Sequence, residues 1–154
     1  MITVRPAIES DAPRIVDFQM GMAWESEALE LDRPTLEQGV AGVFNDTSRG
    51  AYWVAEDDSV LAGMLLTVPE WSDWRNATVL WVHSVYVAPQ ARRQGVYRAL
   101  YDHLHAMVEA SPNLAGLRLY VDKGNTAAQQ VYQALGMTSD HYHLYEWLKP
   151  SLPD

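Results

Sequence analysis

The residues best suited to chemistry follow an apolar stretch that ends at Pro89. Arg92, Arg93 and Arg98 surround Gly95, and this spacing predicts a buried strand, a short polar turn and the start of a helix. The first turn of a helix has backbone N–H groups without intrahelical acceptors and carries partial positive charge, so it binds phosphate groups. Glycine also lets an anion approach the backbone closely. The segment predicts a site for a polyanionic ligand, with a βα turn and solvated arginines as the alternative.

Other phosphate and metal patterns are missing from the sequence. It contains no G-x-x-x-x-G-K-[ST] segment and no G-x-G-x-x-G after a predicted strand. His103 and His105 fall on a predicted helix, at a spacing whose side chains do not face one another. His141 and His143 can point the same way on a predicted strand, but no third ligand accompanies them. We therefore expect no metal site.

The composition describes an acidic protein without cysteine. The 154 residues carry a formal net charge of −9, which opposes nucleic acid and anionic membranes and favours cationic partners such as amines. The lack of cysteine excludes disulfides, thiolate metal sites and cysteine nucleophiles. No stretch approaches the roughly 18 apolar residues of a membrane span, and no long apolar segment follows the N-terminus. We expect a soluble, cytoplasmic protein that binds neither nucleic acid nor membrane.

Apolar periodicity and turn residues predict strands and helices that fit one α/β domain over residues 1–154. A break is expected at residues 24–27, and a loop rich in aromatic residues at 69–76. Helices are predicted over 11–23, 35–44 and 95–111, and from Asn125 to a C-terminal glycine, Gly136. Strands are predicted over residues 2–5, 51–56, 60–68, 78–88, 116–121 and 141–147.

A second segment supports the interpretation of the first. A predicted strand is followed by Asn125, by a helix that contains Tyr132, and by Gly136. Together the two segments resemble the GNAT superfamily of N-acetyltransferases, whose pyrophosphate loop reads R/Q-x-x-G-x-G/A and whose later segment reads strand, Asn, helix with Tyr, then Gly-Phe. Arg92 and Gly95 match the loop, and Met137 stands where the family usually has Phe. The resemblance implies a mixed sheet of six to seven strands flanked by about four helices.

The resemblance also implies that acetyl-coenzyme A (acetyl-CoA) is the cosubstrate. The backbone of Val85 and Val87, on either side of Tyr86, would pair with the pantetheine arm like an added strand, and Asn125 would contact the same arm. Tyr97 departs from the family, which usually has Gly or Ala there, so its phenol would either crowd the pyrophosphate or hydrogen-bond to it. The residues implied to hold the pyrophosphate are Arg92, Arg93, Gln94, Gly95, Val96, Tyr97 and Arg98.

The implied reaction is direct attack of a neutral amine on the thioester carbonyl. Tyr132 would protonate the leaving thiolate, and the alternative is a core aromatic residue on the apolar face of its helix. A base must take the amine proton, and a histidine at position 83 titrates near neutrality. The alternative for His83 is a hydrogen-bonded core histidine. Glu25 and Glu27 are rival bases or amine anchors, with solvated surface carboxylates as the alternative.

The implied acceptor is an amine-bearing small molecule or peptide. We expect Glu25, Trp24 and Trp74, together with Trp71, to line its pocket, because aromatic faces attract ammonium groups. A hydrophobic lid or a dimer contact is the alternative for the tryptophans, and a homodimer is compatible with them and with the strand-like C-terminal segment. The alternative function is a non-catalytic acyl-CoA sensor of the same fold, which Tyr97 favours.

Overall fold

The β-branched and apolar runs of the sequence form one five-stranded sheet in the computed structural model, which describes residues 1–150. The chain divides into two compact units, Met1–Tyr120 and Val121–Asp154, and each is described by itself. The first unit holds the whole sheet and three α-helices, and the second holds one α-helix. The strands are β1 (Ile2–Pro6), β2 (Ala51–Asp57), β3 (Val60–Ser72), β4 (Ala77–Val87) and β5 (Leu114–Leu119).

The strands lie in the order β1-β2-β3-β4-β5. Neighbouring strands are antiparallel except for β4 and β5, which are parallel and therefore need a crossover between them. The helix α3 makes that crossover. The helices are α1 (Ala12–Glu27), α2 (Arg33–Asn45), α3 (Val96–Ala110) and α4 (Thr126–Ala134), and 3₁₀ turns precede α1 at Glu9–Asp11 and α3 at Pro89–Ala91.

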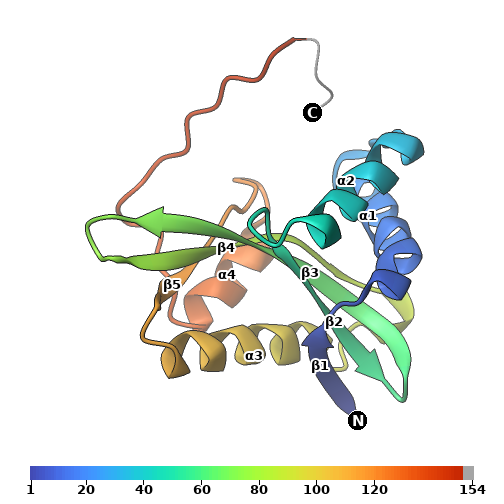
Figure 1. Cartoon of the computed structure of the whole chain (residues 1–154), viewed down its shortest axis with the longest axis horizontal. Helices are drawn as coiled ribbons and strands as arrows, with labels where there is room; N and C mark the ends of the chain where they lie inside the picture. Colours follow the sequence, from blue (N-terminus) through green and yellow to red (C-terminus); the bar gives the residue numbers. More distant parts are fainter. Residues whose placement is uncertain (151–154) are drawn as a thin grey trace. The chain divides into compact units, whose positions relative to one another are not determined.

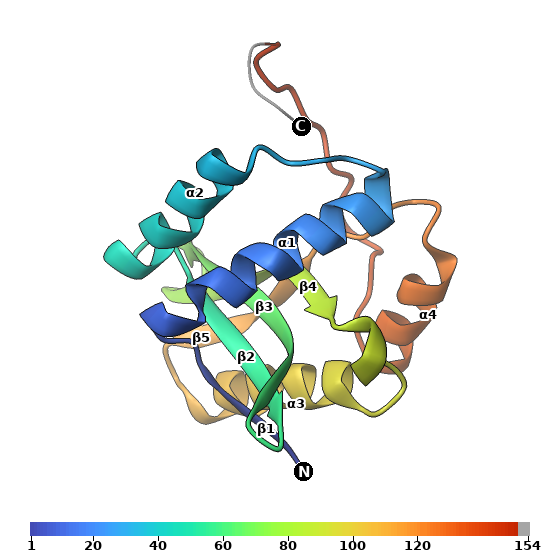
Figure 2. The same cartoon turned by 90° about the vertical axis from the view of Figure 1, so that its right-hand side faces the viewer.

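Figures 1 and 2 show α1 and α2 on one side of the sheet and α3 on the other. Two adjacent residues of β2 demonstrate this arrangement, because successive side chains of a strand point to opposite faces. The ring of Tyr52 lies 5.8 Å from that of Phe44 in α2, whereas the ring of Trp53 lies 5.2 Å from that of His103 in α3. The core is thus two apolar layers, one on each face of the sheet. Its largest fully buried side chains are Phe18, Ile15, Met64, Leu100, Leu104, Val40 and Val54.

The first helix begins where the sequence predicts but extends past the predicted break. Residues 24–27 are helical, and α1 ends at Ala28, whose left-handed φ of 52° terminates the helix. The prediction of a break was therefore wrong. These four residues are exposed, so their polar side chains lie on the solvent side of the helix and leave its backbone hydrogen bonds intact. A polar run in sequence is not by itself a helix end.

The third strand is also longer than predicted. It reaches Ser72 and pairs with β4 through Pro69, opposite Leu80, so the predicted loop shrinks to residues 73–76. Proline has no backbone N–H to donate. It is therefore excluded from strands that are paired on both sides but tolerated where a strand has a neighbour on one side only. The pairing of β3 with β2 ends at Thr67. Beyond that point β3 has only β4 as a neighbour, and Pro69 has no β2 carbonyl to satisfy.

The sheet has five strands instead of the predicted six to seven. The difference includes residues 141–147, which alternate like a strand but pair with no strand in the part of the chain that the structure describes. Their aromatic side chains are exposed, including Tyr142, Tyr145 and Trp147. Alternation provides two faces, but only a neighbouring strand provides the hydrogen bonds that make a sheet.

Two glycines give a test of the packing. A methyl group at Gly63 would lie 2.9 Å from both the carbonyl oxygen of Tyr86 and a side-chain carbon of Val96, so Gly63→Ala should destabilise the protein by about 1–3 kcal/mol through overpacking. Gly39, inside α2, has nothing within 4 Å of such a methyl group, so Gly39→Ala should stabilise by about 0.5–1 kcal/mol. Urea unfolding of both variants measures the two shifts. Equal stabilities would contradict the packing described here.

Candidate functional site

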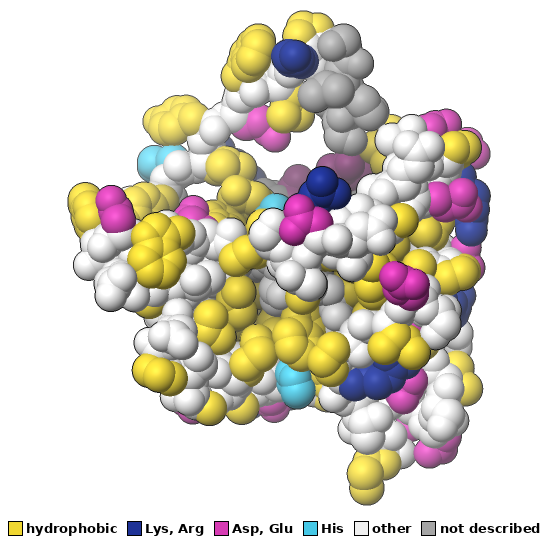
Figure 3. Space-filling model, in the orientation of Figure 1, with side chains coloured by type: hydrophobic (Ala, Val, Ile, Leu, Met, Phe, Trp, Pro, Cys, Tyr) yellow, Lys and Arg dark blue, Asp and Glu magenta, His cyan; other side chains and the backbone are white. Residues whose placement is uncertain are grey.

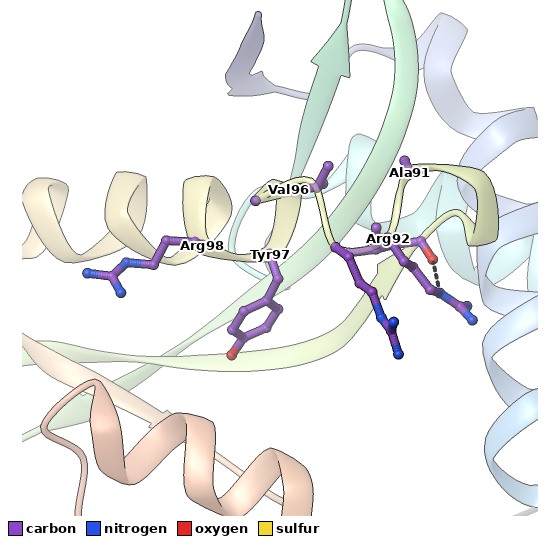
Figure 4. A pocket seen from close by; sticks show the side chains of 8 residues that line it. Ala91, Arg92, Val96, Tyr97 and Arg98 are labelled. Atoms are coloured by element: carbon purple, nitrogen blue, oxygen red, sulfur yellow. Dashed lines mark hydrogen bonds between the residues drawn. The ribbon is translucent and has the colours of Figure 1, made fainter.

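A cavity of about 430 Å³ lies at the start of α3 and is large enough for part of a small ligand. Figure 4 shows it from close by: Tyr97 and Arg98 extend from the first turn of α3, and Arg92 comes from the loop before it. The sequence prediction included every lining residue except Ala91. A small residue of this kind carries no chemical signal in a sequence. The cavity is lined by Val87, Ala91, Arg92, Arg93, Gly95, Val96, Tyr97 and Arg98.

The backbone at this cavity presents N–H groups. Gly95 is the N-cap residue of α3, with a left-handed φ of 84°, and Arg93 has a φ of 63°. No side chain caps the helix, and its first intrahelical hydrogen bond runs from Ala99 to the carbonyl of Gly95 at 2.9 Å. The N–H groups of residues 96–98 therefore have no acceptor within the helix, which is the feature that binds anions at helix N-termini. Gln94 is exposed, and its side-chain amide donates to the carbonyl of Gln90 at 3.2 Å.

The three arginines of the predicted site differ in their partners. Arg98 pairs with Asp102 one turn along α3, at 2.9 Å, and Arg92 pairs with Glu25 of α1 at 2.7 Å. In Figure 4 these two side chains point away from one another. Arg93 makes no ion pair with any residue between 1 and 150. Its guanidinium is therefore the uncompensated positive charge at the cavity.

The strand that leads to the cavity separates from its neighbour before it ends. The register of β4 with β5 stops at Val82 opposite Leu119, whereas its pairing with β3 continues to Val87. A bulge lies between these points, with Ser84 at a left-handed φ of 48°, and bulges bend the strand that contains them. The backbone of residues 83–87 therefore has no β5 partner on one side. This stretch contains the predicted cofactor-pairing residues Val85 and Val87.

The bulge also determines which side chains share a face. His83 lies opposite Leu66, and Tyr86 lies opposite Met64. Both partners belong to the face that α1 and α2 cover, because Leu66 lies opposite Tyr52. His83 and Tyr86 therefore point to the same side although they are three positions apart in the strand.

His83 is half-buried among aromatic rings and makes no hydrogen bond to a residue in the described chain. Its ring lies 5.8 Å from that of Tyr120 and 6.4 Å from that of Trp81. Burial lowers the pKa of His83 below its usual value, because the apolar surroundings disfavour the charged imidazolium. At neutral pH this imidazole is therefore able to accept a proton.

A network joins the end of α1 to the cavity. The hydroxyl of Tyr86 donates to one oxygen of Glu25 at 3.1 Å, and Arg92 donates to the other. Arg92 also donates through Nε to the carbonyl of Val87 at 3.0 Å, the dashed line in Figure 4. Burial, together with the Glu25 carboxylate, raises the pKa of Tyr86, so its hydroxyl remains a donor. The predicted amine anchor Glu25 is thus occupied by two internal donors.

A second cavity, of about 320 Å³, lies at the end of α1 and in the segment that follows. It contains the predicted substrate-binding residue Trp24, with Met20 one turn earlier on the same helix face, and Leu29 and Glu30 after the helix. The sequence analysis missed these last three residues, although the Met20–Trp24 spacing was a usable signal. Trp74 lines neither cavity: it lies in the turn between β3 and β4 and is 90% exposed.

The second unit holds the remaining predicted site residues. The side chain of Asn125 caps α4 by accepting from the N–H of Ala128 at 3.1 Å. Tyr132 is half-buried in the last turn, and its carbonyl accepts from the N–H of Met137 at 3.0 Å. With Gly136 in a left-handed conformation, φ 88°, this is a Schellman C-terminus. The predicted helix and its terminating glycine are confirmed.

The described residues contain neither a cluster of metal-binding side chains nor a helix that could span a membrane. No group of three or more His, Cys, Asp and Glu side chains between residues 1 and 150 is arranged to hold a metal ion. Within the same range, every helix is too short or too polar to cross a membrane. On the face shown in Figure 3, Lys and Arg side chains stand singly or in small groups beside acidic ones.

The fold and the cavity define this chain as an α/β domain with a cavity at the N-terminus of the helix that follows β4. More specifically, the chain belongs to the GNAT acetyltransferase family, whose model, described as acetyltransferase (GNAT) family, matches residues 17–137. It is similar to the structure of a possible acetyltransferase from Clostridium difficile 630. That structure is 34% identical, has a TM-score of 0.92, and aligns with 97% of this chain and 98% of the other.

More distant structures share the fold. A ribosomal-protein-alanine N-acetyltransferase from Brucella melitensis biovar Abortus 2308 is 15% identical, with a TM-score of 0.78 and coverage of 97% and 100%. AAC(6')-Iy in complex with the bisubstrate analog CoA-S-monomethyl-acetylneamine is 14% identical, with a TM-score of 0.76 and coverage of 97% and 99%. Comparison with curated protein sequences finds no match.

The environment of His83 predicts its titration. The folded protein should bind this proton at a pH below the usual histidine value of about 6.5, because burial lowers the pKa of His83. The unfolded chain then binds more protons, so the stability contributed by neutral His83 is present above about pH 6.5 and is lost as the pH falls below it. NMR titration, with His83→Gln to assign the signal, measures the midpoint. A midpoint at or above the usual value would contradict this description of the site.

Proposed function

We propose that the protein is an acetyl-CoA-dependent N-acetyltransferase that acetylates a primary amine of a small molecule or peptide. The observation that carries the proposal is the cavity at the start of α3. There, the N-terminus of α3, which no side chain caps, and Arg93, which pairs with no acidic residue between 1 and 150, lie directly after the open edge of β4. Family membership supports acyl transfer as the type of reaction. The family match also crosses both units, which supports a single acetyltransferase domain, and the cysteine-free composition favours a cytoplasmic protein.

The cavity residues would hold the diphosphate of coenzyme A. The N–H groups of Val96, Tyr97 and Arg98 donate to its oxygens, and Arg93 provides the charge. Gly95, which has no side chain, leaves the helix start open. The phenol of Tyr97 lines the same cavity and is an additional donor, in a position where the family usually has a small residue.

The open edge of β4 would hold the pantetheine arm. Val85 and Val87 lie where β4 has no β5 partner, so their backbone groups are free to pair with an extended ligand as a further strand does. Tyr86, between them, turns its side chain to the α1 face. Its ring therefore packs against α1 and does not contact the arm. In the second unit, we propose that Asn125 contacts the arm through atoms other than the capping oxygen.

Acetyl-CoA supplies an activated acetyl group as a thioester. His83, uncharged at neutral pH and half-buried on β4, takes the proton that the amine nitrogen loses as it forms the new C–N bond. When the C–S bond breaks, Tyr132 gives its phenolic proton to the departing sulfur. These two residues are proposed to perform the two proton transfers of the reaction, one on the nucleophile and one on the leaving group.

The acceptor is proposed to arrive as a cation and to lose one proton to solvent, so that the neutral amine attacks the thioester. The net charge of −9 attracts amines in their usual protonated form. The cavity at the end of α1 offers the ring of Trp24 and the carboxylate of Glu30, which suit an ammonium group attached to an apolar body. The same acidic field opposes the approach of nucleic acid. The exposed Trp71 and Trp74 are better placed for a contact between two copies of the chain.

A non-catalytic acyl-CoA sensor is the second candidate function. One observation favours it: Tyr97 occupies the cavity where the family usually has Gly or Ala. Both candidates require coenzyme A to bind, but only the enzyme releases it as a free thiol. Binding and turnover must therefore be measured separately.

Calorimetry with coenzyme A tests the site. The protein should bind it, and Arg93→Gln should weaken the affinity about tenfold, because a charge-assisted hydrogen bond is worth about 1.5–3 kcal/mol. Arg49→Gln removes the same charge from an arginine that pairs with Asp46 and should leave the affinity unchanged. If the wild-type protein shows no binding to coenzyme A or to its acetyl ester, the proposed function is wrong.

Free-thiol release with acetyl-CoA and a panel of polyamines, aminoglycosides, amino acids and peptides tests catalysis. With the best acceptor, Tyr132→Phe should lower kcat by about 10²–10⁴ while coenzyme A still binds, because only the proton donor is removed. An unchanged kcat would exclude Tyr132 from proton transfer. Binding without thiol release from any amine would favour the sensor.

A further inference from the structure

Glu25 lines neither cavity of the first unit, but a residue of each is close to it: Trp24 precedes it in sequence, and Arg92 is its ion-pair partner. It lies in the last turn of α1, next to Trp24, which lines the cavity at the end of that helix. Its carboxylate accepts at 2.7 Å from Arg92, which lines the cavity at the start of α3. One ion pair thus connects the proposed acceptor side to the proposed cofactor side.

The arrangement around Glu25 is built from several elements. Tyr86 of β4 donates its hydroxyl to the second carboxylate oxygen at 3.1 Å. Gly21, one turn before Glu25, provides the space: a methyl group there would lie 2.9 Å from that hydroxyl. The guanidinium carbon of Arg92 lies 5.5 Å from the centre of the Tyr86 ring. The carboxylate therefore has a defined place beside the loop.

The ion pair is nevertheless able to exchange. The side chains of Arg92 and Glu25 are 44% and 41% exposed, and a pair this accessible to water contributes little to stability. A diphosphate group carries more charge than a carboxylate and matches the planar guanidinium at least as well. When such a group enters the cavity that Arg92 lines, it competes with Glu25 for the same donors.

We infer that Glu25 is an internal counter-ion of the cofactor loop, which holds Arg92 until the diphosphate of coenzyme A displaces it. The inference rests on the proposed function. It makes Glu25 a positioning residue and not the base or the primary amine anchor. The carboxylate that is released belongs to the residue after Trp24 in the last turn of α1, and its negative charge favours an ammonium group at that end of the helix. Cofactor binding then strengthens amine binding, and by linkage the amine strengthens cofactor binding equally.

The inference fixes the sign of a measurable effect. If Glu25 competes with the diphosphate, its removal tightens coenzyme A binding. If Glu25 only holds the loop in a binding conformation, its removal weakens binding. Glu25→Gln separates the two, because glutamine preserves the size of the side chain and one acceptor oxygen, which can still accept from Tyr86, and removes the charge that holds Arg92.

The experiment is a double-mutant cycle in which calorimetry measures the Kd of coenzyme A for the wild type, Glu25→Gln, Arg92→Gln and the double variant. We expect Glu25→Gln to tighten binding about two- to fivefold, the size expected for an exposed ion pair. In the Arg92→Gln background, the same change should have no effect. Glu9→Gln, the same substitution at an exposed residue in the turn before α1, should leave Kd unchanged. Thermal unfolding of each variant confirms that it is folded.

Three outcomes would overturn the inference while leaving the proposed function intact. Unchanged or weaker binding by Glu25→Gln would show that Glu25 does not compete. Equal tightening in both Arg92 backgrounds would show a general effect of charge that does not pass through Arg92. Tightening by Glu9→Gln to the same extent would show an effect of net charge alone. Absence of coenzyme A binding by the wild-type protein, by contrast, would refute the proposed function itself.

Discussion

The separation of β4 from β5 is the constraint on which the rest of this structure depends. Up to Val82 the two strands are paired, and beyond it β4 continues alone beside β3. The left-handed Ser84 makes the bend at this point. If the strands remained paired, β5 would occupy the edge that the proposed pantetheine arm needs. A local backbone distortion thus accompanies the open edge of β4. A residue strained in this way costs about 1–3 kcal/mol of stability.

Charge imposes a second constraint, because the proposed reaction brings together an anionic cosubstrate and a cationic acceptor. A uniformly acidic surface attracts the amine and repels the diphosphate. The structure resolves the conflict locally: Arg92 and Arg98 are compensated by Glu25 and Asp102, and of the three only Arg93 has no ion-pair partner among residues 1–150. Most of the added positive charge is therefore neutralised in the free protein. Only a ligand with more negative charge than a carboxylate can displace the internal acidic partners and bind these arginines.

The features that the sequence predicted correctly are largely those that depend on residues close together in the chain. The loop arginines, Gly95 and the start of α3 form one continuous segment, so local rules located the cavity. The contact between Glu25 and Arg92 joins residues that are far apart in sequence, and no local pattern predicts it. The predicted length of β3 was wrong for a related reason. Pro69 is tolerated because the pairing of β3 with β2 ends at Thr67, and that is a property of the sheet. The alternation of residues 141–147 predicts a strand but cannot provide the neighbour that a strand requires.

The bulge at Ser84 also explains how one strand can serve both partners of the proposed reaction. Without the extra residue, side chains would alternate strictly, and His83 and Tyr86 would point to opposite faces. With it, both point to the side covered by α1 and α2, while Val87 lies opposite Gly63, on the α3 side. In the proposed function, the diphosphate is held at the start of α3. The amine approaches from the α1 side, where His83 receives its proton and Glu25 stands beside the acceptor cavity. The edge of β4 lies between these two faces, and a thioester extended along that edge is therefore reached by the cofactor-binding residues and by the base from opposite sides.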